Sequence, residues 1–159
     1  MTFAKILIPA LLAATLAACG GDDDDTAVDP DASVDCSLVM AGQDEYTPGM
    51  EKIGDNGYTV RLLTSVPGPP VRGDNAWTVL VLDDTQTAAG GITIDVDPFM
   101  PQHGHPTPIE AVVTEVGDPG EYTLDPVNLF MPGVWEVTIE LSEADTLVDD
   151  VMFAFCIDG

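Results

Sequence analysis

The chain has 159 residues, of which 28 are acidic and only 4 are lysine or arginine, so its formal charge is −24 at pH 7. Such an excess of acids repels phosphate backbones, which excludes nucleic acid as a partner and makes cations the expected small ligands. The same acidity also keeps a secreted protein soluble, and that role accounts for most of the charge. The length suits one domain with a sizeable core.

Residues 1–18 predict a secretory signal peptide. Lys5 supplies a positive start, and residues 6–18 form an almost unbroken apolar run, shorter than the ~20 residues of a membrane-spanning helix. The run ends in the sequence LAAC, which resembles the lipobox of bacterial lipoproteins. The resemblance implies cleavage before Cys19 and acylation of its thiol. The alternative is an ordinary signal peptide with a chance cysteine at its cleavage site.

Residues 19–35 are expected to form an acidic flexible tether. The run GGDDDD at residues 20–25 cannot build a core or a strand, and its charges repel one another. A leash directly after Cys19 favours the lipoprotein interpretation, because the cysteine is then the anchor, and two or three acyl chains bind a membrane firmly. We therefore expect a lipid-anchored protein of the bacterial cell envelope. Gly20, in place of aspartate after the cysteine, implies the outer membrane, on either face.

Cys36 and Cys156 are the cysteines that remain once Cys19 is acylated, and they lie at the two edges of the expected domain, residues 36–159. In an oxidising compartment such a pair predicts a disulfide. Closing a loop of this length stabilises the fold by at most about 4–5 kcal/mol in the chain-entropy model. Two free thiols that bind a metal are the alternative, which suits a secreted chain less well.

Side chains in the expected domain alternate between apolar and polar with a period of two, and no mature segment has the spacing of a helix. Turn residues such as PGPP, GG and GDPG separate the alternating runs. Seven short strands of this kind predict an all-β, immunoglobulin-like antiparallel β-sandwich. Residues 36–57 show no clear pattern and suit either an added strand or a segment that wraps an edge. The apolar positions of the runs are Tyr58, Val60, Leu62; Trp77, Val79, Val81; Ile92, Ile94, Val96; Ile109, Ala111, Val113; Tyr122, Leu124; Trp135, Val137, Ile139, Leu141; and Val151, Phe153, Phe155.

The only two histidines lie together in the sequence MPQHGHP at residues 100–106. In an extended segment His103 and His105 project to the same side, about 6.5–7 Å apart at the backbone. Gly104 lets the chain bend so that both imidazoles reach one ion. A lone H-x-H is a weak motif, and histidines flanked by glycine and proline are also ordinary loop residues.

The expected strand order brings Met131 into the same region. If successive strands reverse direction, the loops after the third and the fifth strand gather at one end of the sandwich, and Met131 follows the fifth. Two imidazoles with the thioethers of Met100 and Met131 form a ligand set that suits Cu(I), whereas imidazoles alone also accept Cu(II) or zinc. Methionines before proline that simply fill the end of the core are the alternative.

Three stretches resemble the YtkA-like/FixH-like group of secreted β-sandwich domains: MPQHGH at residues 100–105, GEY at 120–122 and FMPGVWEV at 130–137. The resemblance covers roughly residues 58–156. It implies a small sandwich associated with copper handling and cytochrome oxidase assembly, in which Trp135 packs beside the site. Carried over residue by residue, the implied ligands are Met100, His103, His105 and Met131.

The sequence contains no G-x-S-x-G, no H-E-x-x-H and no cysteine left to act as a nucleophile, so we do not expect an enzyme. Paired acids such as Asp95 and Asp97 suit Ca²⁺, but without EF-hand spacing the simpler interpretation is a solvated face. Two functions are therefore carried forward. One is a membrane-anchored module that binds copper in envelope metal handling, and the other is a non-catalytic module that binds another envelope protein and no metal.

Overall fold

The structure is a computed structural model that describes residues 35–38 and 42–159. The predicted signal peptide, Cys19 and the tether up to residue 34 lie outside the described residues. One 3₁₀ turn, η1 (Cys36–Leu38), precedes a set of β-strands. Within the described ranges, no helix has the length and apolar character needed to cross a bilayer.

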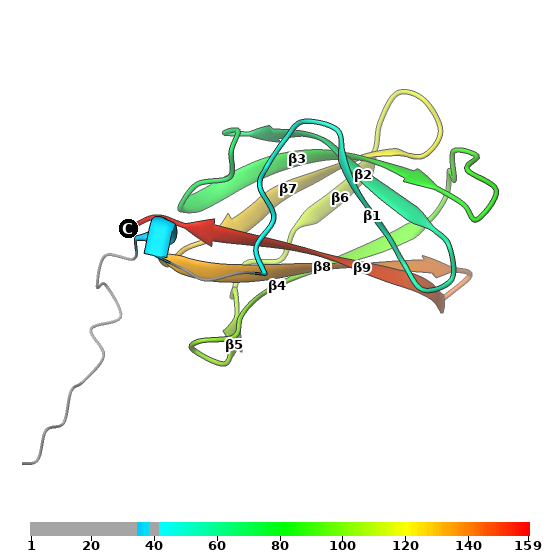
Figure 1. The fold of residues 1–159 in the computed structure, drawn as a ribbon. Coiled ribbons are helices and arrows are strands. Elements are labelled where there is room, and N and C mark those ends of the chain that lie inside the picture. Colours follow the sequence, from blue (N-terminus) through cyan, green and yellow to red (C-terminus); the bar gives the residue numbers. More distant parts are fainter. Residues whose placement is uncertain (1–34, 39–41) are drawn as a thin grey trace, which may run out of the picture.

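The described strands form two antiparallel sheets that face each other (Figure 1). The five-stranded sheet has the order β1-β2-β3-β7-β6, and the four-stranded sheet has the order β5-β4-β8-β9. In chain order the strands are β1 (Met50–Ile53), β2 (Thr59–Val66), β3 (Gly73–Leu82), β4 (Thr93–Met100), β5 (His105–Pro106), β6 (Val112–Glu115), β7 (Glu121–Leu129), β8 (Gly133–Glu143) and β9 (Thr146–Ile157).

The predicted immunoglobulin-like sandwich is confirmed, and seven of the strands carry its topology. The order β2-β3-β7-β6 reproduces strands A, B, E and D of an immunoglobulin constant domain, and β4-β8-β9 reproduces C, F and G. The expected number of about seven strands is corrected by two additions. β1 lies in the stretch before residue 57 that shows no clear alternation, and β5 has only two residues, too few to leave a pattern.

Alternation places the apolar side chains between the two sheets, as the period of two predicts. Trp77 lies at the centre, where its ring stands edge-on to Phe153 and Phe155 at centroid distances of 6.2 and 5.7 Å. The expected strand from Ile109 to Val113 is partly wrong, because Ile109 is exposed and β6 begins only at Val112. Pro108 cannot donate to a ladder, which helps to keep the chain directly before β6 out of the sheet.

The predicted disulfide between Cys36 and Cys156 is confirmed, with a Cα–Cα distance of 5.7 Å. It joins the start of the described chain to the end of β9, and Figure 1 shows this junction at one end of the sandwich. We call this part of the molecule the histidine end, because the histidine loop lies there too. Its loops are residues 67–72, 101–104 and 130–132, which follow β2, β4 and β7.

Candidate functional site

A tight turn between β4 and β5 holds the two histidines. The carbonyl of Met100 accepts hydrogen bonds from the amides of His103 (3.1 Å) and Gly104 (2.8 Å). Gly104 has a φ of +68°, a conformation that a residue without a side chain adopts easily. Beyond the turn, Thr107 donates from its amide to the carbonyl of Pro98 at 2.9 Å, which holds the returning chain against β4. His103 therefore lies in a bonded turn and His105 at the start of β5, rather than both in one extended segment as expected.

The turn brings the two imidazoles together. The ring centroids of His103 and His105 lie 5.7 Å apart, with an interplanar angle of 49°. Two imidazoles bound to one ion through nitrogens at ~2.0 Å have centroids no more than roughly 6.4 Å apart, so this spacing fits a shared ion. His103 is exposed and His105 is half-buried.

One nitrogen of His105 has a protein partner. Its Nδ1 lies 3.2 Å from the carbonyl oxygen of Pro106. A carbonyl oxygen only accepts hydrogen bonds, so this contact favours the tautomer with its proton on Nδ1. In the neutral imidazole with this tautomer, Nε2 is the nitrogen that is available to bind a metal.

An aromatic layer supports His105, and sequence reasoning missed it. The His105 ring stacks on Phe130 at 5.7 Å with an interplanar angle of 22°, and Phe130 meets Trp135 edge-on at 5.4 Å. Trp135 is fully buried, and its Nε1 donates to the carbonyl of Met131 at 2.9 Å. The loop after β7 therefore lies against the histidine turn, at the end of the sandwich where strand order placed this loop.

The two methionines lie deeper in the structure than metal ligands on an exposed loop would lie. Met100 pairs with His105 across the β4–β5 ladder, so both side chains point to the inner face, about 5 Å apart at Cβ. Met100 is fully buried and belongs to the hydrophobic core. Met131 is partly buried against the same core. The thioether of Met100 therefore lies beneath the histidine surface rather than on it.

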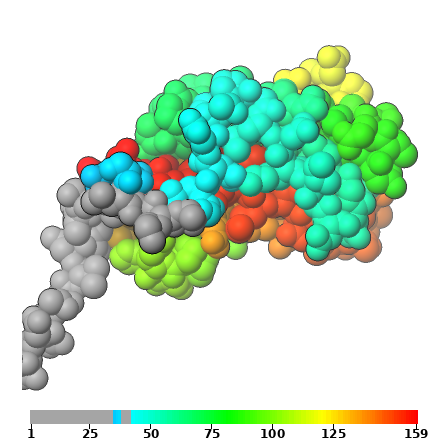
Figure 2. Space-filling view, viewed as in Figure 1, coloured from blue at the N-terminus to red at the C-terminus, as the bar shows by residue number. Residues whose placement is uncertain are grey.

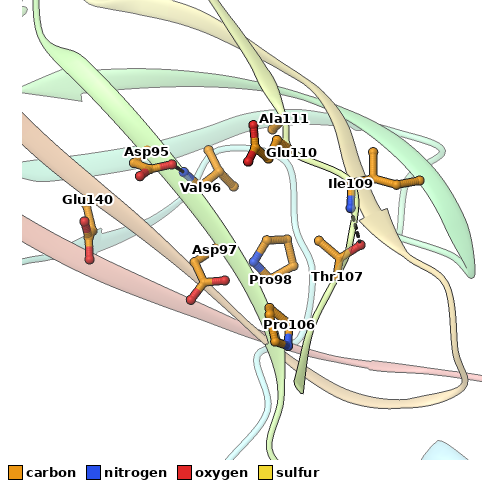
Figure 3. A pocket seen from close by; sticks show the side chains of 10 residues that line it. All are labelled: Asp95, Val96, Asp97, Pro98, Pro106, Thr107, Ile109, Glu110, Ala111 and Glu140. Atoms are coloured by element: carbon orange, nitrogen blue, oxygen red, sulfur yellow. Dashed lines mark hydrogen bonds between the residues drawn. The ribbon is translucent and has the colours of Figure 1, made fainter. Parts of the chain in front are cut away.

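A second feature, an acidic pocket of about 410 Å³, lies along the open edge of β4. Figure 3 shows Asp95 and Asp97 on β4, Glu140 on β8, and Glu110 on the segment that faces them. No group of three or more histidine, cysteine, aspartate or glutamate side chains among residues 35–38 and 42–159 is placed to hold a metal ion. These acids therefore form a charged surface and not a cation site.

The fold and the turn define an immunoglobulin-like domain with a histidine pair at one end. The YtkA-like family matches residues 52–140, more than half of the chain, and the protein belongs to that family. The matched region contains the histidine turn and the loop after β7, and it ends within β8. No curated protein and no solved structure matches the chain.

Proposed function

We propose that the protein is a lipid-anchored lipoprotein of the bacterial envelope that binds copper through His103 and His105 and takes part in envelope metal handling. The close placement of the two imidazoles supports the metal-binding part most directly. Copper is the cargo of this site, and the proposal includes no catalysis.

The donor set favours a soft ion. The two histidines have no third histidine, cysteine or carboxylate partner positioned with them among the described residues. A third donor has to come from a thioether, from solvent or from a partner protein. Met131 is the candidate, because it follows directly after Phe130, the residue on which His105 stacks. Imidazole with thioether is a combination that favours Cu(I) over the harder divalent ions.

A copper titration of the full-length protein, purified from membranes in detergent, tests the metal site. Cu(I) is added in competition with a chromophoric chelator. We expect one equivalent to bind, at least tenfold more weakly in His103→Ala or His105→Ala, and no specific binding in the double variant. Gln102→Ala is the matched control, because it alters the same turn and removes no proposed ligand. Binding of equal strength in the double variant removes the proposal.

A methionine substitution tests the third donor separately. Met131→Leu keeps the volume of the side chain and removes its sulfur, so the fold should lose less than about 1.5 kcal/mol. We expect weaker Cu(I) binding and unchanged Cu(II) binding. An equal loss for both oxidation states shows that the substitution disturbed the histidines and not a sulfur ligand.

The proposed anchor has its own test. Mass spectrometry of the N-terminal peptide should show an acylated Cys19 at the start of the mature chain. Cys19→Ser should move the protein from the membrane fraction to the soluble fraction. An unmodified cysteine, or a variant that stays in the membrane fraction, contradicts the anchor without bearing on copper.

The second candidate function is a module that binds another envelope protein and no metal. The complete burial of Met100 favours it, because a core role is enough to explain a methionine at that position. The copper titration separates the two candidates, since this module binds no Cu(I) specifically.

A further inference from the structure

We propose that the histidine end docks against the surface of the bilayer that carries the anchor, so that His103 and His105 face the membrane. The inference rests on the proposed lipid at Cys19 and is independent of metal binding. Three observations support it: the distribution of acids between the two ends, the exposed apolar side chains, and the place where the chain from the anchor enters the domain.

Acids are distributed unequally between the two ends of the sandwich. The loops of the histidine end, residues 67–72, 101–104 and 130–132, contain no aspartate or glutamate. Among the described residues, acids flank this end at Asp74, two residues after the first loop, and at Asp35 and Asp158, within two residues of the disulfide cysteines. Arg72 lies in the first of the three loops.

The opposite end, which we call the acidic end, consists of residues 54–58, 83–92, 116–120 and 143–145. These loops contain no lysine, arginine or histidine. Headgroups of an anionic bilayer repel this end and leave the histidine end free to approach. The acids of the acidic end are Asp55, Asp83, Asp84, Asp118, Glu143 and Asp145.

Apolar side chains are exposed at the histidine end. Val66 is 66% exposed and Val71 is 40% exposed, at the two ends of a proline-rich loop. Exposed apolar residues also occur at the acidic end, where Ile53 and Leu147 lie, so exposure alone does not choose an end. The histidine end is the one that combines exposed apolar side chains with loops free of acids, and this combination suits a lipid surface.

The chain from the anchor enters at the histidine end. Cys36 is fixed there by its disulfide to Cys156, and it lies 17 positions after Cys19 in the sequence. A flexible segment of that length spans about 20–25 Å on average and at most about 60 Å. Figure 2 shows the light-green residues around 100–106 at the same end of the molecule as the blue residues near position 36.

The length of the sandwich makes one orientation easier to reach than the other. β8 has 11 residues, so the acidic end lies roughly 35 Å from the histidine end. An orientation with the acidic end on the lipid requires the segment between Cys19 and Cys36 to span roughly 35 Å, which is more than its average span of about 20–25 Å. Attachment through a short flexible segment gives an effective concentration in the millimolar range, so weak contacts are enough to keep the histidine end on the surface.

Quenching by labelled lipids tests the orientation without added copper. The full-length lipoprotein is reconstituted in phosphatidylethanolamine–phosphatidylglycerol vesicles that contain a lipid with a nitroxide on its headgroup. A fluorophore is attached to Gln102→Cys at the histidine end or to Thr146→Cys at the acidic end. We expect several-fold stronger quenching at position 102. Equal quenching at both positions, or stronger quenching at position 146, overturns the proposal.

Paired charge variants give the matched control. Val66→Asp with Val71→Asp places two acids at the histidine end and should lower the quenching at position 102 to the level at position 146. Ile53→Asp with Leu147→Asp adds the same charge at the acidic end and should leave the quenching unchanged. An equal effect of both pairs contradicts docking through the histidine end.

Two further results distinguish a failure of the proposed anchor from a failure of the proposed docking. If Cys19 carries no lipid, both the anchor and the docking proposal fail. If Cys19 is acylated and position 102 is quenched no more than position 146, only the docking proposal fails. A change in the fluorescence at position 102 that needs no vesicles and grows with protein concentration identifies contact between copies of the chain. That result also overturns membrane docking.

Discussion

The Cε methyl group of Met100 lies 2.5 Å from the point at which a Cβ on Gly133 would stand. Gly133 is buried at the start of β8 and has a φ of +130°, a conformation that disfavours a side chain. The end of the Met100 side chain occupies the space that a side chain on Gly133 would need. The histidine turn and the loop after β7, which are far apart in the sequence, are therefore packed as one unit.

Gly133→Ala should destabilise the fold by about 2–4 kcal/mol, because its methyl group displaces Met100 and its backbone is strained. Urea unfolding measures the loss. Gly91→Ala is the control, since Gly91 also has a positive φ, +74°, but a Cβ at this position would meet no atom within 4 Å. That variant should lose only about 1 kcal/mol from strain. Equal losses in the two variants would show that Met100 moves aside at no cost.

Asp149→Ala should lower the free energy of unfolding by about 2–4 kcal/mol, because it removes a buried acceptor and leaves two partly buried backbone donors without that partner. The buried carboxylate of Asp149 accepts hydrogen bonds from the amides of Asn56 (3.1 Å) and Tyr58 (3.0 Å), which fixes the turn between β1 and β2. Asp150→Ala is the matched control, because its side chain is exposed on the next residue. Chemical denaturation of both variants decides the point, and a similar effect of the two would contradict the buried role.

Glu140→Lys should stabilise the protein by about 0.5–2 kcal/mol at low salt. Asp95, Glu140 and Asp150 lie directly opposite one another on three neighbouring strands, and like charges in such positions are destabilising. The lysine replaces two repulsions with two attractions. Thermal unfolding should show the gain shrinking in 1 M NaCl, where charges beyond about 3 Å are screened. A gain of the same size at both salt concentrations would assign the effect to something other than charge.

Stability should fall as the pH rises from about 10 to 12, in part because of Tyr58. Its hydroxyl donates to Glu143 at 2.7 Å, and this bond raises the pKa of Tyr58 from its ordinary value of 10.0 to about 12. A group whose pKa is raised by folding contributes stability below its unfolded pKa and loses that contribution as the pH passes its folded pKa. Absorbance at 295 nm follows the ionisation, and the melting temperature of Tyr58→Phe should depend less steeply on pH in this window. Equally steep curves for the two proteins would contradict the assignment.

The fold followed from local patterns wherever a strand has one face in the core. Residues 133–143 alternate because β8 lies between two neighbouring strands with its inner face against the other sheet. β5 was not predictable, since a strand of two residues exists only through its partner. The burial of Asp149 was not predictable either, because a carboxylate in a sequence carries no sign of the amides that will surround it.

In the candidate site, too, some features follow from local sequence and others do not. His103 and His105 meet because they share one turn, which is a local property of the sequence around Gly104. The support of His105 by Phe130 is different, because β5 and β7 belong to different sheets and no local pattern connects them. Only the rule that successive strands reverse direction predicted at which end of the sandwich the loop after β7 lies.

The bond between Cys36 and Cys156 also has a mechanical consequence. A pull on the chain before Cys36 passes through the two sulfurs to the end of β9, which is bonded along its length to β8. The residues between the two cysteines form a closed covalent ring. Such a force therefore does not extend this part of the chain or separate its strands one after another. While the sulfurs stay joined, a pull on the chain before Cys36 leaves the strands between the two cysteines paired.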